Sequence, residues 1–536
     1  MLKPYYHYIF PVLIVFTLAY LFLSYQIADY TLLDLDEPRY PKAAREMIEA
    51  AQYILPMTNG KFLFAKPILI YWAQILSFKT FGITEFAARL PSVLAASLTI
   101  VMSYIFSRIL KISWFLPVIL ACSVEFFVIA RLSIADMLLN FFIISVLALY
   151  YLIAENFIDK KFFLLLVFFV SMGFLAKGPL AIFVPTLVIA TYSLAKHFFR
   201  ISNLKNTLTI LNNNLQLLFL MFLIFLFCGL GWYLVAHNAS SGEFTKQFFL
   251  TENLQRFTST LSGHKHDWYF YILVMLVGFL PWSIFIPSYL INLKANLELN
   301  FKIKLFAFSW ILSCLLFFSS SGTKLYNYIF SVFFPLALLL ALWLHEKSRK
   351  KEIFFTSLIL LALSISLYFT DPVQTLLKPG SILLSFVTSA NLLTAFVAFL
   401  VLMLVGLLPF SQKKYFIVFS SVLIYLFCFS VTNFLRPFAK FKTGGIQRFV
   451  TKIPNAYNLY SLDMDRPSLG YYANKYVTII KKKKLKKITL QNEKFCILAK
   501  KNAKHFLEQQ KSLILRDQDF SYVFFCSLPA ITPTPT

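Results

Sequence analysis

The sequence contains no P-loop, no glycine-rich dinucleotide-binding loop and no Gly-x-Ser-x-Gly nucleophile motif. These absences argue against the nucleotide-dependent enzymes and serine hydrolases that such motifs mark. Charged residues are also scarce: they make up 14% of the 536 residues, whereas 59% of the residues are hydrophobic. So little charge and so much apolar surface predict a polytopic membrane protein rather than a soluble one.

Acidic residues are the scarcer of the two charge types, with 24 Asp and Glu against 50 Lys and Arg, so the net charge is +26. The basic residues are spread through loops between apolar runs, and nucleic acid is therefore not an expected partner. Anionic lipid head groups are the natural partners of such a surface. The first apolar run lacks a small-residue cleavage site, which predicts a retained helix rather than a cleaved signal.

Cysteine is rare too, with six residues in the chain. Cys122, Cys228, Cys314 and Cys428 lie in apolar runs, where cysteine is usually a packing residue. Cys496 and Cys526 lie in the polar tail. They can form a disulfide if the tail is exported, but the sequence alone does not decide whether they pair.

Thirteen apolar runs are long enough to cross, or nearly cross, a hydrocarbon core of about 30 Å. Several are short or nearly fused, so the pattern sets the number of spanning helices to within one or two. The runs are 7–27, 86–108, 114–130, 133–154, 161–176, 178–196, 215–236, 268–290, 303–320, 325–345, 352–370, 388–409 and 413–434. Residues 67–82 are also apolar, but their lysines and Trp72 predict a helix that lies in the membrane interface.

Lysine and arginine set the expected orientation. With a cytoplasmic N-terminus, alternate short loops are basic, as the positive-inside rule requires. The opposite, extracytoplasmic side then receives the first loop (28–85), the long loop (237–267) and everything after about 435. We therefore predict a membrane domain over 1–435 and an exported domain over 436–536.

After about residue 435 the long apolar runs end, and the pattern of short strands and a helix predicts a small α/β domain. Strands are expected at 476–480, 495–498 and 522–526, and a helix at 503–510. The lysine-rich run at 481–487 is either a solvated face or a contact with anionic lipid. No internal repeats are visible.

A dense ionic cluster spans residues 34–47, directly after the first apolar run. Pro38 and the Asp36-Glu37 pair suit the first turn of a helix, on which Asp36, Arg39 and Tyr40 would share a face. Ionisable groups so close to a membrane are functional candidates. The alternative is that Asp36 is only an N-cap and Arg39 its solvated partner.

The predicted topology brings polar residues from five separate segments to the same membrane face. The candidates are Asp36, Glu37, Arg39, Tyr40, Lys66, Arg131, Asp136, Lys177, Lys324 and Tyr328. The long loop adds Glu252, Arg256, His264, His266 and Asp267. Clustered cations suit a phosphate or pyrophosphate on a lipid. Carboxylates can deprotonate an acceptor or hold a sugar. The alternative is that these residues only form a solvated extracytoplasmic rim and have no catalytic function.

The first-loop residues 36–40 and 44–47 resemble the signature of the bacterial aminoarabinose transferase family. Matching blocks follow in the same order at 59–61, 66–72, 81–92, 174–179, 232–233, 278–282 and 321–329, with a weaker echo at 468–472. This family consists of membrane glycosyltransferases of the GT-C fold and is related to protein O-mannosyltransferases. The resemblance implies that a sugar, often an amino sugar such as 4-amino-4-deoxy-L-arabinose or a hexosamine, moves from a polyprenyl-phosphate carrier to lipid A. The transfer would take place at the periplasmic face of the inner membrane.

The resemblance also implies roles for individual residues. Asp36 and Asp136 match the family's two key acidic positions. Arg39, Lys66 and Lys177 match positions suggested to hold the carrier phosphate, and Tyr40 and Tyr328 match aromatic positions near the cavity. Glu37, Arg131 and Lys324 are expected to line the substrate cavity.

One departure from the family concerns metal binding. Family members commonly have an acidic residue before the motif lysine, where this chain has Ala65, and a histidine where it has Asn253. Those positions resemble a metal-bridging pair, so we expect no zinc there and no cofactor. His264-x-His266 near Asp267 is a weak metal signal, and a structural role is favoured.

Two alternative functions remain. The first is the same donor chemistry with a protein or another glycan as acceptor. The second, less favoured, is transport of a lipid-linked sugar, because transporters usually show paired halves with broken helices, which this sequence does not.

Overall fold

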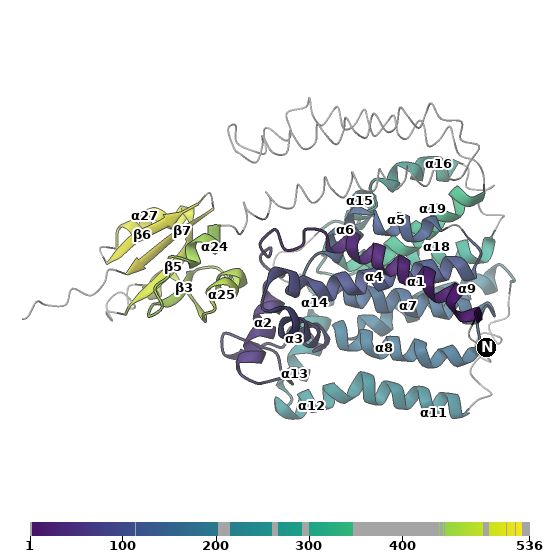
Figure 1. Ribbon diagram of the computed structural model, residues 1–536, viewed down its shortest axis with the longest axis horizontal. Helices are drawn as coiled ribbons and strands as arrows, with labels where there is room; N and C mark the ends of the chain where they lie inside the picture. Colours follow the sequence, from purple (N-terminus) through teal and green to yellow (C-terminus); the bar gives the residue numbers. More distant parts are fainter. Residues whose placement is uncertain are drawn as a thin grey trace, which may run out of the picture.

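The computed structural model describes residues 3–112, 114–201, 215–259, 266–291, 300–346, 439, 443, 445–485, 493–510, 512–519 and 521–527. The expected runs at 352–370, 388–409 and 413–434, and the expected domain boundary at 435/436, lie outside these residues. The described part is a helical bundle followed by a small mixed domain (Figure 1). This agrees with the predicted all-α membrane domain and α/β tail.

The bundle is built from long apolar helices that pack side by side. Its main members are α1 (Lys3–Ser24), α4 (Glu85–Ile109), α7 (Asp136–Ala154), α8 (Phe163–Lys177), α9 (Leu180–Phe198), α11 (Leu215–Ile224), α12 (Gly231–Ala239), α18 (Phe301–Ser319) and α19 (Phe333–Glu346). A π-helical segment, Phe225–Leu230, joins α11 to α12. α7 packs against α4 and α8, α1 against α4, and α9 against α18. The core of the bundle lies between these helices.

Six helical segments of the described chain are long and apolar enough to span a membrane, so the protein is a multi-pass membrane protein. They are Glu85–Ile109, Asp136–Ala154, Leu180–Phe198, Leu215–Ala239, Phe301–Ser319 and Tyr326–Leu344. The last includes the 3-10 helix Tyr326–Val332, which runs into α19. Residues Ile9–Ser24 form a shorter apolar helix.

Two predicted spans are wrong in detail because the chain interrupts them. The run 114–130 is divided into α5 (Phe115–Ala121) and α6 (Val124–Ala130), since Ser123 has an extended backbone. The run 268–290 is divided into α15 (Phe270–Gly278) and α16 (Ile286–Ile291). Pro281 lies in the break, and proline cannot donate the hydrogen bond that a continuous helix needs there.

Short elements cover one end of the bundle. They are α2 (Arg39–Glu49), β1 (Met57–Thr58), β2 (Lys61–Phe62), α3 (Leu69–Phe81), α13 (Glu243–Lys246), the π-helix Gln247–Gln255 and α14 (Arg256–Thr258). The helix expected at 67–82 is thus present as α3. Figure 1 shows α2, α3, α13 and α14 at the end nearest the tail domain, and the N-terminus at the opposite end. The first loop and the tail therefore share one end.

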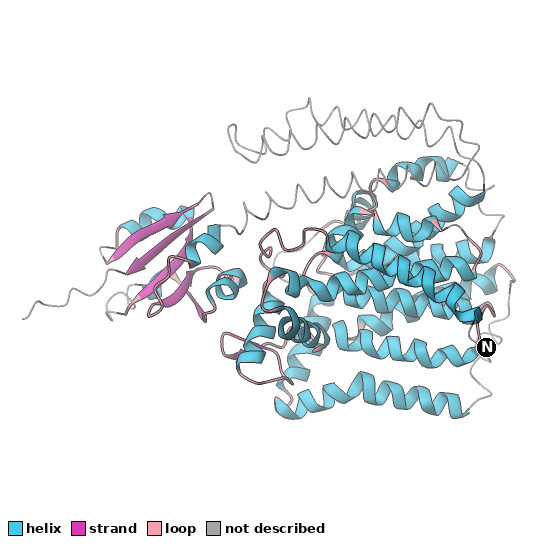
Figure 2. Cartoon of the chain, viewed as in Figure 1, coloured by secondary structure: helices cyan, strands magenta, loops and turns pink. Residues whose placement is uncertain are grey.

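The tail domain is a five-stranded sheet in the order β4-β3-β5-β7-β6. Its strands are β3 (Asn458–Leu462), β4 (Val477–Ile480), β5 (Phe495–Lys500), β6 (Leu513–Gln518) and β7 (Tyr522–Ser527), and its helices are α24 (Gly445–Val450), α25 (Pro467–Ala473) and α27 (Lys504–Glu508). β3 pairs in parallel with β4 and β5, whereas β7 pairs antiparallel with β5 and β6. Apart from β1 and β2, all described strands lie in this domain (Figure 2). The expected strands and helix are present, while β3 and β6 were not predicted.

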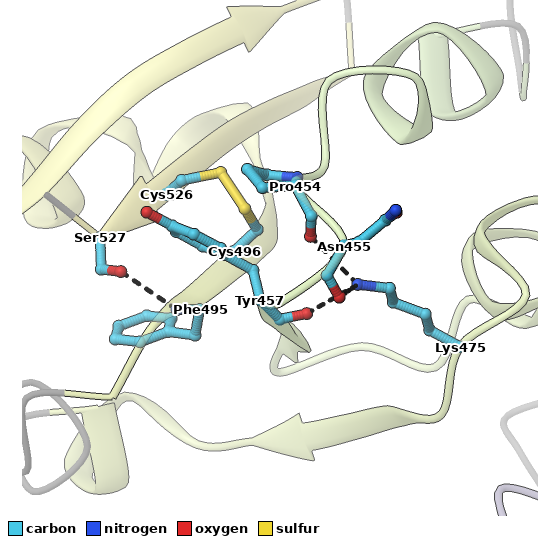
Figure 3. The surroundings of a disulfide bond; sticks show 8 residues. All are labelled: Pro454, Asn455, Tyr457, Lys475, Phe495, Cys496, Cys526 and Ser527. Carbon is cyan, nitrogen blue, oxygen red and sulfur yellow. Dashed lines mark hydrogen bonds between the residues drawn. A yellow bond between two sulfur atoms is a disulfide. The ribbon is translucent and has the colours of Figure 1, made fainter. Parts of the chain in front are cut away.

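A disulfide joins Cys496 on β5 to Cys526 on β7, which are direct partners in the antiparallel ladder (Figure 3). The pairing that the sequence left open therefore forms. Beside it, the Lys475 ammonium donates hydrogen bonds to the carbonyls of Pro454, Asn455 and Tyr457 at 2.7–3.1 Å (Figure 3). These contacts secure the segment that leads into β3.

Candidate functional site

The ionic cluster of the first loop forms a turn followed by a helix. α2 begins at Arg39, with Pro38 as its N-cap, so Asp36 and Glu37 precede the helix instead of occupying its first turn. Arg39 Nη1 still lies 3.9 Å from Asp36 Oδ1, at the expected spacing of three residues. The side chain of Asp36 is 70% exposed, and this carboxylate is accessible to a partner from solution or from the membrane surface.

Glu37 has a different environment, although it is the next residue. Its carboxylate accepts hydrogen bonds from Arg89 Nε at 2.6 Å and from the backbone N–H groups of Leu33 and Ser133 at 2.7 and 3.1 Å. The Arg89 guanidinium also donates to the carbonyls of Ile27, Tyr30 and Thr31. The pair is buried, so the structure places Glu37 in the scaffold that shapes the first loop.

Asp136 and Lys177 form the central contact of the site. Asp136 is the first residue of α7 and Lys177 the last of α8, and Lys177 Nζ lies 2.5 Å from Asp136 Oδ1. These positions match the helix dipoles, which favour an anion at an N-terminus and a cation at a C-terminus. Asn327 Nδ2 donates to the same oxygen at 2.9 Å, and the Lys177 ammonium lies 5.6 Å from the ring centre of Tyr328. A cavity adjoins the pair, lined by Asp136, Asn140, Lys177, Asn327, Tyr328 and Ser331 together with apolar side chains.

Lys66 brings a second cation to this region. It lies just before α3, and the carboxylates of Glu252 and Asp136 are among the charges that act on its ammonium. Burial, with the positive charges of Lys177 and Arg256 nearby, lowers the pKa of Lys66 to about 8. A buried cation beside two further cations is suited to an anionic ligand.

Arg256, on α14, is the third cation; the sequence placed it on the same membrane face as the other candidates but gave it no individual role. Its Nη2 lies 3.2 Å from Glu252 Oε2, one helical turn earlier, and its Nε is buried without a hydrogen-bond partner in the described structure. The backbone N–H of Thr323 donates to the Arg256 carbonyl at 3.2 Å. The long loop is thereby attached to the segment that carries Lys324 and Tyr328. The sequence signals for this position were its place in the long loop and its spacing of four residues from Glu252.

The remaining candidates divide between the site and the core. Tyr40 is buried on α2 with its ring 6.0 Å from that of Tyr71. Lys324 is half-buried in the loop before Tyr328. Arg131 is completely buried, donates to the Leu23 carbonyl at 3.3 Å and lies 4.9 Å above the ring of Phe127. Arg131 is thus packed between helices, with Nε and Nη2 unpartnered in the described structure.

Within the described residues, no group of three or more His, Cys, Asp and Glu side chains could hold a metal ion. Ala65 has no ligating atom, and Asn253 Nδ2 donates to the Phe248 carbonyl at 2.8 Å. His264 lies outside the described residues. The ring of His266 stacks on Phe270 with centroids 4.1 Å apart.

Comparison with known sequences gives a consistent set of relatives. Residues 65–232 match the family model described as dolichyl-phosphate-mannose-protein mannosyltransferase. An uncharacterised protein of Aquifex aeolicus is 30% identical over 343 residues, which cover 63% of this chain and 74% of that protein. Undecaprenyl phosphate-alpha-4-amino-4-deoxy-L-arabinose arabinosyl transferases of Wigglesworthia glossinidia brevipalpis and Pseudomonas paraeruginosa are 29% and 31% identical. The matches cover 65% and 62% of this chain, and 61% and 59% of those two transferases.

The fold has a solved counterpart over nearly its whole length. The crystal structure of ArnT from Cupriavidus metallidurans bound to undecaprenyl phosphate superposes with a TM-score of 0.82, covering 97% of this chain and 98% of that one at 19% identity. The apo form of the same protein gives a TM-score of 0.80. This likeness confirms the predicted GT-C fold.

Proposed function

We propose that this chain, which is similar to the aminoarabinose transferases and has their GT-C fold, transfers an amino sugar from a polyprenyl-phosphate carrier to lipid A. The arabinosyl transferases named above are specific for 4-amino-4-deoxy-L-arabinose by name, and this sugar is the first candidate donor. The observation that carries the proposal is the gathering of Lys66, Lys177 and Arg256, together with the carboxylates of Asp136 and Glu252, at one end of the bundle. We place this end at the periplasmic face of the inner membrane.

The donor is a phosphodiester whose carrier phosphate is the leaving group. An acceptor oxygen attacks the anomeric carbon, the bond from that carbon to the carrier phosphate breaks, and the phosphate leaves with the electron pair. Its charge rises from one to two negative units during this step. Fixed cations stabilise such developing charge. We assign that role to Lys66, Lys177 and Arg256, with Arg39 at the first loop.

The acceptor determines whether a carboxylate of the site must act as a general base. A lipid A phosphate is already ionised near neutral pH, because the second pKa of a phosphomonoester is about 6. No strong base is then needed, and Asp36 acts mainly by orienting the acceptor or the sugar. A hydroxyl acceptor on a protein or another glycan has to lose its proton, and Asp36, exposed at the first loop, would then be the base.

We further propose that the transfer proceeds without a resident metal. The support is that Ala65 offers no ligand and that the Asn253 side chain is engaged with the backbone at Phe248. Elemental analysis of the purified protein tests this proposal. One tightly bound zinc ion per chain would contradict it.

The proposed function is tested by reconstitution of the full-length protein in liposomes with undecaprenyl-phosphate-linked aminoarabinose and lipid A. We expect lipid A to gain the mass of one aminoarabinose residue, and Lys66→Ala and Asp136→Asn to suppress the product. Lipid A that stays unmodified while another glycan or a protein gains the sugar would favour the alternative acceptor. Movement of intact donor across the bilayer without any transfer would favour the transporter.

A further inference from the structure

The tail domain is fastened to the first loop by α25. The backbone N–H of Ser468 donates to the carboxylate of Asp34 at 3.0 Å, and the Ser468 hydroxyl donates to the other oxygen. The Leu32 N–H donates to the Tyr472 hydroxyl oxygen at 2.8 Å, and Arg45 Nη1 donates to the Tyr471 carbonyl at 3.2 Å. Residues 468–472, which resemble a family motif, therefore join two parts of the chain.

These fastening contacts are sheltered from water. Ser468, Tyr471 and Leu32 are buried, and burial raises the pKa of the Asp34 carboxyl. A second connection lies beside them, where the Val477 N–H donates to Asn59 Oδ1 at 3.0 Å. Sheltered hydrogen bonds persist when ligands and salt change, so they hold the domain in place.

One contact between the two parts has a different character. Arg39 Nη2 lies 3.1 Å from Asp465 Oδ2, in the turn between β3 and α25. Both side chains are accessible, at 31% and 53% exposure. The aspartate of the tail is thus closer to Arg39 than Asp36 is, at 3.9 Å.

We propose that Asp465 is the resting counter-ion of Arg39, which orients the guanidinium and yields it to the phosphate of the polyprenyl carrier. This inference rests on the proposed function, because it takes Arg39 as a ligand of that phosphate. Exposed ion pairs contribute little, whereas guanidinium and phosphate form strong bidentate pairs. The exchange leaves the Asp34–Ser468 contact intact, so the tail stays attached while Arg39 changes partner. Asp465 is a positioning residue in this scheme.

The sign of one binding measurement separates this role from a merely structural one. A counter-ion competes with the phosphate, so removal of its charge strengthens binding. A residue that only fastens the tail has the opposite effect, because its loss loosens the first loop and weakens binding. The expected gain is about two- to fivefold, the range that an exposed ion pair supports.

The experiment measures the affinity of full-length protein in nanodiscs for undecaprenyl phosphate, at low and at high salt. The variants are Asp465→Asn, Arg39→Gln, their combination, and Asp463→Asn as the matched control. Asp463 is an exposed aspartate of the same turn, and the described structure shows no side-chain hydrogen bond or ion pair for it. Asp463→Asn thus removes the same charge without touching Arg39.

We expect Asp465→Asn to bind two- to fivefold more tightly than the wild type and Asp463→Asn, with the gain shrinking at high salt and vanishing in the Arg39→Gln background. Equal affinity of the two asparagine variants, weaker binding of Asp465→Asn, or a gain that survives Arg39→Gln would each overturn the inference. If the wild type binds no undecaprenyl phosphate, the proposed function fails and this inference with it. Wild-type binding with no effect of Asp465→Asn overturns this inference alone.

Discussion

Lys177 and Asp136 meet at 2.5 Å although they end and begin two different helices of the bundle, α8 and α7. Neither side chain is more than 8% exposed, and Asn327 adds a hydrogen bond to the same carboxylate. A charge pair held in this way fixes the ends of three segments relative to one another. The position of the ammonium is therefore set before any ligand arrives, as electrostatic stabilisation of a leaving group requires.

Replacement of Asp136 by Asn tests this organisation. The amide cannot neutralise Lys177, so the ammonium loses its fixed position, and we expect turnover to fall at least about a hundredfold. Transfer of labelled sugar to lipid A measures it, with Asp267→Asn as the control because Asp267 is exposed and its carboxylate bonds only Tyr269 among the described residues. Turnover near the wild-type value in a folded Asp136→Asn protein would remove Asp136 from the site.

The lowered pKa of Lys66 predicts a pH dependence. The Lys66 side chain is mostly protonated below about pH 8 and loses its positive charge above it. Affinity for undecaprenyl phosphate should therefore decline as the pH rises through that range. Lys66→Arg keeps its charge at every accessible pH, and its affinity should stay level between pH 7 and pH 9. Lys61→Arg, at an exposed site on β2, is the control and should follow the wild type. A wild-type affinity that does not change across pH 8 would contradict the role of Lys66.

The buried pair of Arg89 and Glu37 predicts a large effect on stability. Removal of one partner leaves a buried charge without compensation, which typically costs about 3–5 kcal/mol. Arg89→Met should therefore lower the thermal midpoint in detergent sharply, and the double variant Arg89→Met/Glu37→Gln should recover part of the loss. Lys504→Met removes a partly exposed pair with Glu508 and should have little effect. Equal midpoints for the two single variants would show that the Arg89 pair is not structural.

The Cys496–Cys526 bridge predicts a redox-dependent stability of the tail. It closes a loop with a sequence separation of 30, and bridges of this kind typically contribute about 2–4 kcal/mol. We expect Cys496→Ala/Cys526→Ala to make the tail more sensitive to protease than the wild type. Cys122→Ala, which removes a buried free thiol, is the control. Thiol labelling of the unreduced native protein at Cys496 or Cys526 would show that the bridge does not form in the cell.

The sequence predicted the classes of structure well because its signals there are strong. Long apolar runs and the strand pattern near Val477, Phe495 and Tyr522 both reflect burial, which hydrophobicity reports directly. The resemblance also identified Asp136 and Lys177, which the structure brings together. The breaks at Ser123 and Pro281 were missed because the length of an apolar run does not report where the backbone leaves the helical conformation.

Side-chain partners were much harder to predict than elements. Glu37 was expected at the substrate cavity, yet Arg89, 52 residues away, takes its carboxylate into the scaffold. Arg131 was expected there too and is buried against Phe127. Hydropathy treats every charged residue as an outlier in the same way, and only three-dimensional packing decides which of them meets a partner in the core.

The hydrogen bonds between Asp34 and Ser468 join residues that are 434 positions apart. During synthesis the first loop emerges early, and it has no mate until almost the entire polypeptide has left the ribosome. This contact between the first loop and the tail can therefore form only late in synthesis, and a chain that ends before Ser468 lacks it.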